Sequence, residues 1–147
     1  MIWQPTDLDP ENLSSIESHR AEVRLPNLRE AVALDAAAER WPVGRAGAVV
    51  CINMIHIAPW AACEGLARGA ARTLGPRGVL FLYGPFRVGG ALPAPSNVAF
   101  DASLRERDPA WGVREIDDVT ALCTAHGLHR EAVVPMPANN YAVVFRR

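Results

Sequence analysis

Apolar residues along this chain of 147 residues fall into short runs that alternate with stretches of helical spacing. Leu13, Ile16 and Val23 recur at the spacing of one helix face. Asp9 followed by Pro10 is typical of a helix start, because Asp caps the first turn and proline fits its first position. The pattern therefore predicts a first helix that begins at Pro10.

Two stronger apolar runs predict buried strands. Residues 48–52 (AVVCI) and 79–83 (VLFLY) are apolar at consecutive positions, which is typical of parallel strands covered on both faces. A weaker run over residues 28–34, which stops at Asp35, predicts a further short strand.

A helix is predicted between these two strong strands. It opens at Pro59, and its apolar face repeats at helical spacing in Cys63, Leu66, Ala70 and Leu74. Gly65 and Gly69 lie four residues apart on this helix, and small residues at this spacing let a neighbouring segment pack closely.

The C-terminal third predicts two more helices and a hairpin. Ser96 is expected to cap one helix, and a second is expected to start near Glu115 and to end at Gly127. Two strands follow over residues 130–134 and 141–145. Their connection is too short for a parallel crossover, so they are predicted to be antiparallel.

This alternation of strands and helices predicts an α/β fold whose sheet is mainly parallel and ends in an antiparallel hairpin. The length fits one domain over residues 1–147. Half of the residues are apolar and 21% are charged, which is ordinary globular composition.

Charge narrows the classes of function. The net charge of -1 lacks the basic excess typical of nucleic-acid-binding proteins, so no nucleic-acid partner is expected. All 15 basic residues are arginine. The absence of lysine excludes Schiff-base chemistry, pyridoxal enzymes and the phosphate-binding lysine of P-loops.

Several other signals are missing. The N-terminus has no basic region followed by an apolar run, and the most apolar stretch is too interrupted to span a membrane. Three cysteines without CxxC spacing argue against a disulfide framework or a zinc site, and no metal is expected. We therefore expect a cytoplasmic chain. HExxH, GxSxG and GxGxxG motifs are also absent.

Polar or conformationally special residues follow four successive predicted strands: Asp7, Asp35, residues 53–56 and residues 83–86. Ligands of open α/β sheets bind beyond the carboxyl ends of the strands, so this rim is predicted to be a site. Asp7 could accept both hydroxyls of a ribose, or it could be a turn residue. Asp35 could contact an adenine amino group, or it could cap the following turn.

Two further positions allow both a functional and a structural interpretation. His56 is the one histidine inside an apolar run, and it could be a general base or a hydrogen-bonded histidine of the core. Asn139 and Asn140 precede the last strand, where their amides could reach into a cleft or could make the hairpin turn.

Several strings resemble one known family, and together they cover nearly the whole chain. They are WQPTD (3–7), CINMIHIAPW (51–60), LYGPF (82–86), PSN (95–97), FD (100–101), RDPAWG (107–112) and MPANN (136–140). The sequence resembles a bacterial domain-of-unknown-function family placed among the S-adenosylmethionine-dependent methyltransferases and related to vertebrate methyltransferase-like protein 26.

The resemblance implies a Rossmann-like methyltransferase fold of seven strands and S-adenosylmethionine as cofactor. By this resemblance Asp7 would bind the ribose, and Asp35 and Ala36 would lie beside the adenine. Asn53 and Met54 would face the methionine part of the cofactor.

The resemblance also implies an acceptor side and a base. His56 would face the transferred methyl group and is the first candidate for a catalytic base. The residues that would line the acceptor site are Tyr83, Phe86, Asn97, Asp101, Trp111, Asn139 and Asn140. The expected activity is methyl transfer to an unknown, small acceptor.

The sequence departs from the family pattern at its start. Family members carry a first strand and a Gly-rich cofactor loop before the segment at which this sequence begins. That strand would lie in the middle of the sheet, so the domain is expected to be N-terminally incomplete and its cofactor binding impaired. Unpaired strand edges would favour a homo-oligomer.

Two other functions stay open on the sequence. A non-catalytic remnant of the methyltransferase fold would act by association with itself or with a partner. A nicotinamide oxidoreductase would use the same ribose-binding acid, but it has no support beyond the fold.

Overall fold

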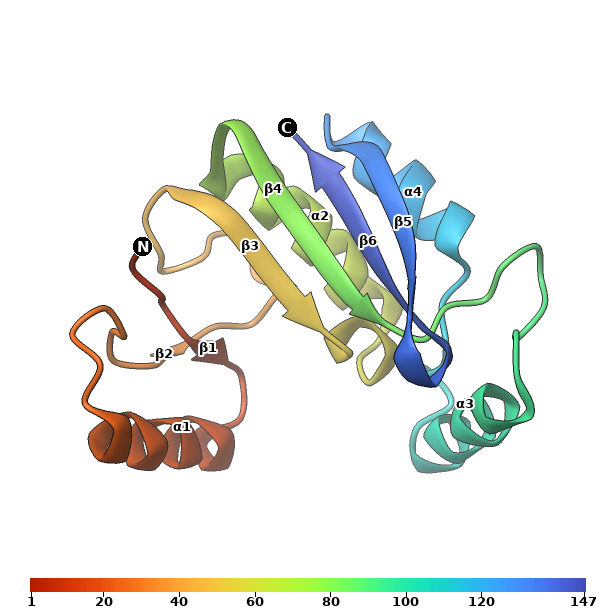
Figure 1. Cartoon of the computed structure of the whole chain (residues 1–147), viewed down its shortest axis with the longest axis horizontal. Helices are drawn as coiled ribbons and strands as arrows, with labels where there is room; N and C mark the ends of the chain where they lie inside the picture. Colours follow the sequence, from red (N-terminus) through yellow and green to blue (C-terminus); the bar gives the residue numbers. More distant parts are fainter.

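The computed structural model describes residues 1–147 and forms an α/β fold (Figure 1). In chain order its elements are β1 (Thr6–Asp7), α1 (Pro10–Val23), β2 (Val32–Ala33), β3 (Ala46–Ile52), η1 (Met54–His56), α2 (Trp60–Thr73), β4 (Leu74–Gly84), α3 (Pro95–Arg107), α4 (Ile116–Ala125), β5 (His129–Met136), η2 (Pro137–Asn139) and β6 (Asn140–Arg146), where η denotes a short 3-10 helix. None of the helices is both long enough and apolar enough to cross a membrane.

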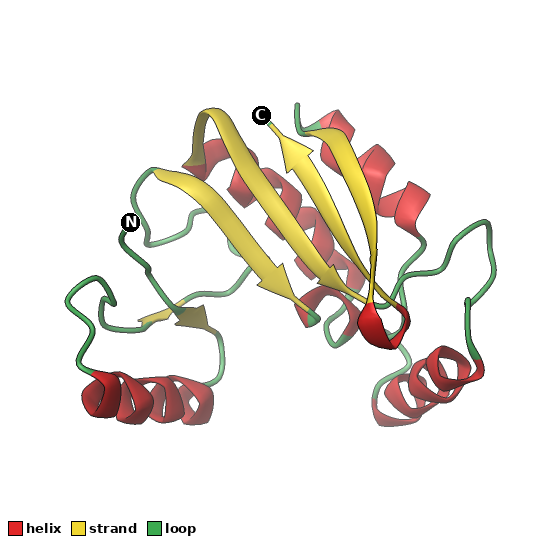
Figure 2. Ribbon diagram, viewed as in Figure 1, coloured by secondary structure: helices red, strands yellow, loops and turns green.

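The strands form two separate sheets (Figures 1 and 2). The larger has the order β3-β4-β6-β5, and β3 and β4 run parallel, with Val49 opposite Leu80. β6 is antiparallel to both β4 and β5, which confirms the predicted C-terminal hairpin. The smaller sheet is the parallel pair β1-β2, so the mixed α/β fold with parallel strand pairs agrees with the sequence prediction.

Helices α2 and α4 pack on one face of the larger sheet (Figure 1). The main core lies between these layers and includes the wholly buried Leu80, Phe86 and Phe145. The three cysteines belong to this core and come from three different elements: Cys51, Cys63 and Cys123.

The opposite face of β3 is bare, which corrects the prediction that both faces of this strand are covered. Side chains alternate between the faces of a strand. Val49 and Cys51 face the helices, whereas Val50 and Ile52 face outward and are 43% and 59% exposed. The apolar run correctly located the strand, but it did not show which face had a covering layer.

Residues 28–34 form much less strand than predicted, since only Val32 and Ala33 pair with β1. An isolated bridge joins Trp3 to Leu28 further upstream. Pro5 lies between the two pairings, and proline lacks the N–H that would continue the ladder. The strand predicted over residues 28–34 is therefore interrupted because of Pro5 in the segment that pairs with it, and not because of its own residues.

Most helix ends follow the sequence signals, and one does not. The Asp9 carboxylate accepts a hydrogen bond from the Glu11 N–H at 2.8 Å, and Gly127 has a left-handed φ of 76° directly after α4. The predicted cap at Ser96 is wrong. α3 begins at Pro95, whose fixed φ suits the first helical position, so the cap residue is Ala94, two positions earlier.

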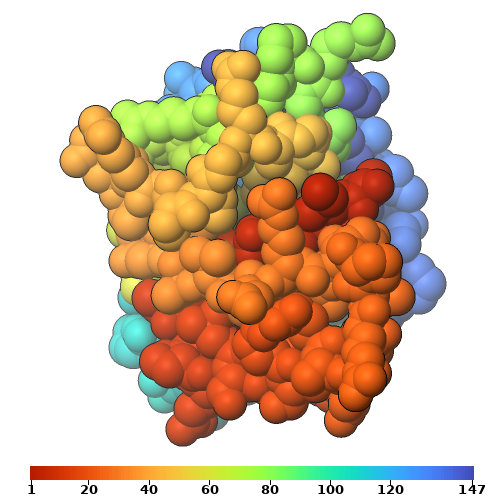
Figure 3. Space-filling view, turned by 90° about the vertical axis from the view of Figure 1, so that its left-hand side faces the viewer, coloured from red at the N-terminus to blue at the C-terminus, as the bar shows by residue number.

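Gly65 and Gly69 permit the predicted close packing against α2. A Cβ on Gly65 would collide with the Ala36 carbonyl, and one on Gly69 would collide with the Trp41 ring. The Trp41 indole N–H donates to the Ala36 carbonyl at 3.2 Å, which holds the loop in place. Much of the side of the molecule shown in Figure 3 belongs to the N-terminal part of the chain, coloured red to orange.

Candidate functional site

The parallel strands β3 and β4 end side by side and place two loops at one edge of the sheet. Ile52 is opposite Tyr83 in the register, and the Asn53 N–H donates to the Tyr83 carbonyl at 2.8 Å. This bond extends the ladder one residue beyond β3. The segments after these two strands therefore form one continuous rim, as the sequence predicted for them, whereas Asp7 ends and Asp35 follows a strand of the separate β1-β2 sheet.

Asn53 turns the chain sharply at this rim. Its φ of 59° is left-handed, a conformation that Asn tolerates better than most residues, and its carbonyl accepts from the His56 N–H at 3.0 Å. Gly84 lies against the same turn. A Cβ at Gly84 would lie 2.8 Å from both Asn53 Oδ1 and His56 Nε2, so the close approach requires glycine.

His56 is fully buried beneath the rim. Its Nδ1 accepts from the Arg114 backbone N–H at 3.3 Å, and its carbonyl accepts from the Gly112 N–H at 2.9 Å. The ring meets Phe86 edge to face, with 5.1 Å between centroids. His56 thus joins the turn after β3 to the segment before α4.

The environment of His56 favours the neutral imidazole. Burial, followed by the positive charge of Arg114, lowers the pKa of His56 to about 3. Because Nδ1 is an acceptor, the hydrogen of the neutral ring is assigned to Nε2, which makes no hydrogen bond within the chain. This arrangement positions the turn, and the role of His56 as a base stays a prediction.

Asp101 is a second buried polar group behind the rim. Its carboxylate accepts from Arg87 at 2.8 Å, from Arg105 at 3.1 Å and from the Val113 N–H at 2.7 Å. Burial by itself would raise the pKa of Asp101, but the hydrogen bonds from Arg105, Val113 and Arg87 outweigh burial and hold the pKa below its usual value. Asp101 therefore fastens α3 to the segment that contacts His56.

A pocket of about 230 Å³ opens at the rim between α3 and the turn that joins β5 to β6. Its lining consists of Asn53, Pro85, Ser96, Asn97, Phe100, Ala138 and Asn140. None of these residues is charged, and three carry amides that can both donate and accept hydrogen bonds. The pocket can therefore bind a neutral polar molecule.

Hydrogen bonds set the shape of this pocket. The Asn97 side chain donates to the Asn139 carbonyl at 3.0 Å, and the Asn140 side chain donates to the Tyr83 hydroxyl at 3.3 Å. Ala138 and Asn139 both have a left-handed φ of 58°. The two asparagines thus make the hairpin turn and also approach the pocket, so both interpretations of this pair describe the structure.

The structure brings some of the predicted acceptor residues together and separates others. Asn97 and Asn140 line the pocket beside Asn53, and Tyr83 and Asn139 bond to the lining. The remaining three do not line it. Phe86 and Asp101 are buried behind the rim. Trp111 lies elsewhere, with its ring 5.2 Å from the Arg107 guanidinium.

The residues predicted to hold the cofactor lie at or after the ends of strands from both sheets. Asp7 ends β1, and its Oδ1 accepts from the Asp9 N–H at 2.9 Å, while Asp35 Oδ1 accepts from the Ala37 N–H at 2.8 Å. The second carboxylate oxygen of each acid makes no hydrogen bond within the chain. Met54 packs partly against the core.

Four pocket residues were not predicted to bind the cofactor or the acceptor, although one of them, Pro85, lies in the predicted rim: Pro85, Ser96, Phe100 and Ala138. A signal for Ser96 and Phe100 exists in the sequence, because residues four apart share one helix face. No sequence pattern indicates that Ala138 meets this face, since the hairpin turn must first fold over α3.

Solved structures share this architecture. Mitomycin 7-O-methyltransferase MmcR matches with a TM-score of 0.84 at 16% identity, over 100% of this chain and 42% of its own. An O-methyltransferase family 2 protein from Planctomyces limnophilus DSM 3776, in complex with apigenin, matches with a TM-score of 0.82 at 16% identity, over 98% and 43%. LepI in complex with SAM matches with a TM-score of 0.75 at 15% identity, over 99% and 36%.

Fold and rim together define a chain of the Rossmann-like methyltransferase fold class. The chain spans less than half the length of these solved structures. It belongs to the family described as protein of unknown function (DUF938), whose match covers residues 1–147.

Proposed function

We propose that this chain is part of an S-adenosylmethionine-dependent methyltransferase that acts on a small acceptor. The observation that carries the proposal is the polar rim at the ends of β3 and β4, which opens into the uncharged pocket beside Asn53. Ligands of open α/β sheets bind at such an edge. The structural neighbours named as methyltransferases support the same reaction class, and the relationship to methyltransferase-like protein 26 stays a prediction.

The hydrogen-bond acceptors at the strand ends suit the cofactor. Asp7 has a free carboxylate oxygen at a strand end, where it can accept from ribose hydroxyls. Asp35 and Ala36 would lie beside the adenine, and Asn53 and Met54 beside the methionine part. When bound, the cofactor supplies a methyl group that is already activated by a sulfonium.

The chain's own residues would mainly orient the acceptor. The amides of Asn97 and Asn140 can hold its polar groups, and Phe100 offers an apolar surface. Orientation of two reactants supplies much of the rate when no strong chemical activation is needed. His56 is the proposed base for an acceptor that keeps its proton, and its burial means that the turn after β3 must open for this role.

We also propose that a further strand and a Gly-rich loop complete the domain between β1 and β3. The support is the division into two sheets, in which the edge of β3 away from β4 has no strand partner. An unpaired edge of a parallel strand exposes backbone donors and acceptors that another strand can bond. Such a strand would join the two sheets into one.

Calorimetric titration with S-adenosylmethionine tests the proposal on the 147-residue chain and on a longer chain that carries a strand and a Gly-rich loop before Met1. The Asp7→Ala variant of the longer chain should bind about tenfold to a hundredfold more weakly, because hydrogen bonds to a carboxylate are worth about 1.5–3 kcal/mol. Asp9→Ala is the control, since it removes only the cap of α1. Absence of binding to the longer chain would refute the methyltransferase proposal.

A further inference from the structure

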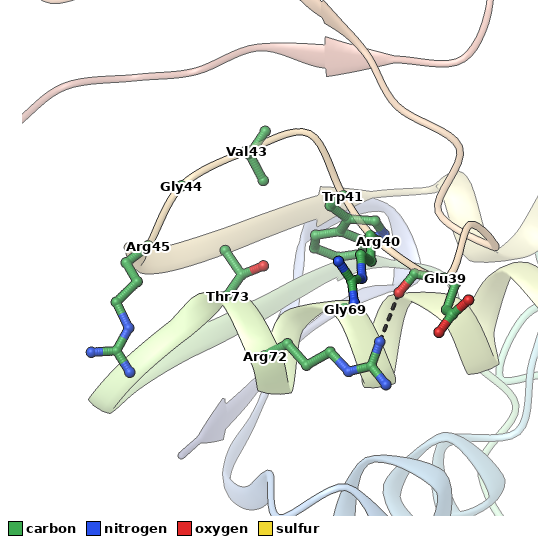
Figure 4. A pocket seen from close by; sticks show the side chains of 9 residues that line it. All are labelled: Glu39, Arg40, Trp41, Val43, Gly44, Arg45, Gly69, Arg72 and Thr73. Carbon is green, nitrogen blue, oxygen red and sulfur yellow. Dashed lines mark hydrogen bonds between the residues drawn. The ribbon is translucent and has the colours of Figure 1, made fainter.

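A second pocket lies at the other end of β3, away from the rim. It has a volume of about 240 Å³ between the loop that leads into β3 and the last turn of α2 (Figure 4). The residues that line it are Glu39, Arg40, Trp41, Val43, Gly44, Arg45, Gly69, Arg72 and Thr73. This pocket has no part in the proposed methyl transfer.

The wall of this pocket is firmly built. The Trp41 ring lies directly against Gly69, and the Arg72 side chain donates to the Glu39 carbonyl at 2.7 Å. One helical turn away, Arg68 donates to the Ala37 carbonyl at 2.9 Å. Three side chains thus hold the loop on α2 beside the pocket.

Three arginines and one acid, Glu39, line the pocket, so the charge of its lining is positive on balance. In Figure 4, Arg40 and Arg72 lie at one end near Gly69, and Arg45 lies at the other end beyond Thr73. No carboxylate oxygen lies within 4.0 Å of any of the three guanidinium groups. The guanidinium groups of Arg40 and Arg45 also make no hydrogen bond within the chain, so their donors are available to a ligand.

We propose that this pocket binds a small anion of the diphosphate class. The planar guanidinium donates two parallel hydrogen bonds to phosphate oxygens, which makes arginine well suited to phosphate recognition. Two phosphoryl groups would place negative charge near Arg40 and Arg72 at one end and near Arg45 at the other. The Thr73 hydroxyl, between the two ends, can donate a further hydrogen bond.

Calorimetric titration of the chain with inorganic pyrophosphate, methyl diphosphate and orthophosphate tests this proposal. Pyrophosphate should bind saturably and more tightly than orthophosphate, and added salt should weaken binding because it screens the charges. Comparison of methyl diphosphate with pyrophosphate shows whether the pocket prefers a diphosphate ester or the free diphosphate ion. Binding of either diphosphate supports the proposal.

Arginine variants locate the binding. Arg40→Gln and Arg45→Gln should each weaken pyrophosphate binding about tenfold, since a hydrogen bond to a charged group is worth about 1.5–3 kcal/mol. Neither side chain holds the loop, so both variants keep the fold. Arg29→Gln is the matched control, because Arg29 is exposed and lies outside the pocket. Equal affinity for orthophosphate and pyrophosphate would overturn the proposal. Undiminished pyrophosphate binding by the variant that carries both Arg40→Gln and Arg45→Gln would also overturn it.

Discussion

His56 shows how a single residue can have a location that the sequence predicts and an environment that it does not. The sequence correctly placed His56 in the segment that follows β3. Whether that residue faces solvent depends on Phe86 and on the segment around Gly112, which are far away in the sequence. The packing of these segments buries the imidazole and makes it neutral.

Burial of a neutral histidine predicts a specific pH dependence of stability. The pKa of His56 is about 3 in the folded chain and 6.5 ordinarily, so the unfolded state binds the extra proton between these values. The stabilisation is therefore complete above pH 6.5 and is lost as the pH falls from 6.5 toward 3. The slope for one such group is at most about 1.4 kcal/mol per pH unit.

Urea unfolding at a series of pH values measures this slope. His56→Gln should flatten the dependence between pH 6.5 and 3, because glutamine can accept from the Arg114 N–H without titrating. His19→Gln is the control, since His19 is an exposed residue of α1. A His56→Gln variant that keeps the wild-type slope would contradict the assignment.

At the scale of elements, local signals predicted most helices and strands, and tertiary contacts decided the exceptions. Capping signals correctly placed the start of α1 after Asp9 and the end of α4 shortly before Gly127. The strand predicted over residues 28–34 shrank to β2 because of Pro5 on its partner. No local pattern in residues 28–34 carries information about a proline more than twenty residues upstream.

The contact between α2 and the preceding loop should be sensitive to one methyl group. Gly69→Ala would place a Cβ into the Trp41 ring, and overpacking of this kind costs about 1–3 kcal/mol. Alanine's better helix propensity, worth about 1 kcal/mol, offsets only part of this. Thermal unfolding should therefore show a melting temperature several degrees lower.

Gly47→Ala provides the matched control, because a Cβ at Gly47 would meet no atom within 4 Å. Its melting temperature should stay close to that of the wild type. Trp41→Leu should relieve the collision, so the double variant with Gly69→Ala should lose less stability than the two separate changes together. Additive losses would show that the two residues do not pack against each other.

At the scale of the whole molecule, the division into two sheets leaves β3 with an unpaired edge and an uncovered apolar face. Exposed edges of this kind pair with other chains. We expect the 147-residue chain to self-associate in a concentration-dependent way in sedimentation experiments. Val50→Lys should shift the chain toward monomer, because it puts a charge on the bare face.

Val23→Lys is the control for this experiment, since Val23 is 54% exposed on α1, away from β3. It should leave self-association unchanged. A wild-type chain that sediments as a monomer at all concentrations, with its sheet intact, would contradict the prediction.

The sequence predicted where the candidate site lies, but only some of the residues that line it. Position after a strand singles out Asn53, position before the last strand singles out Asn140, and the family resemblance adds Asn97; the structure places all three in one pocket. The pocket near Trp41 was not predicted, because its arginines come from the loop before β3 and from the end of α2. These arginines come together only because the loop before β3 packs against Gly65 and Gly69 of α2.

The three buried cysteines can be used to measure local opening of the core. Burial raises the pKa of Cys51 and Cys123 to about 12 and that of Cys63 to about 11, so these thiols are inert while the core is closed. They come from β3, α2 and α4, so each thiol lies on a different wall of the core. The rate at which an alkylating reagent labels each cysteine therefore measures how often that wall opens.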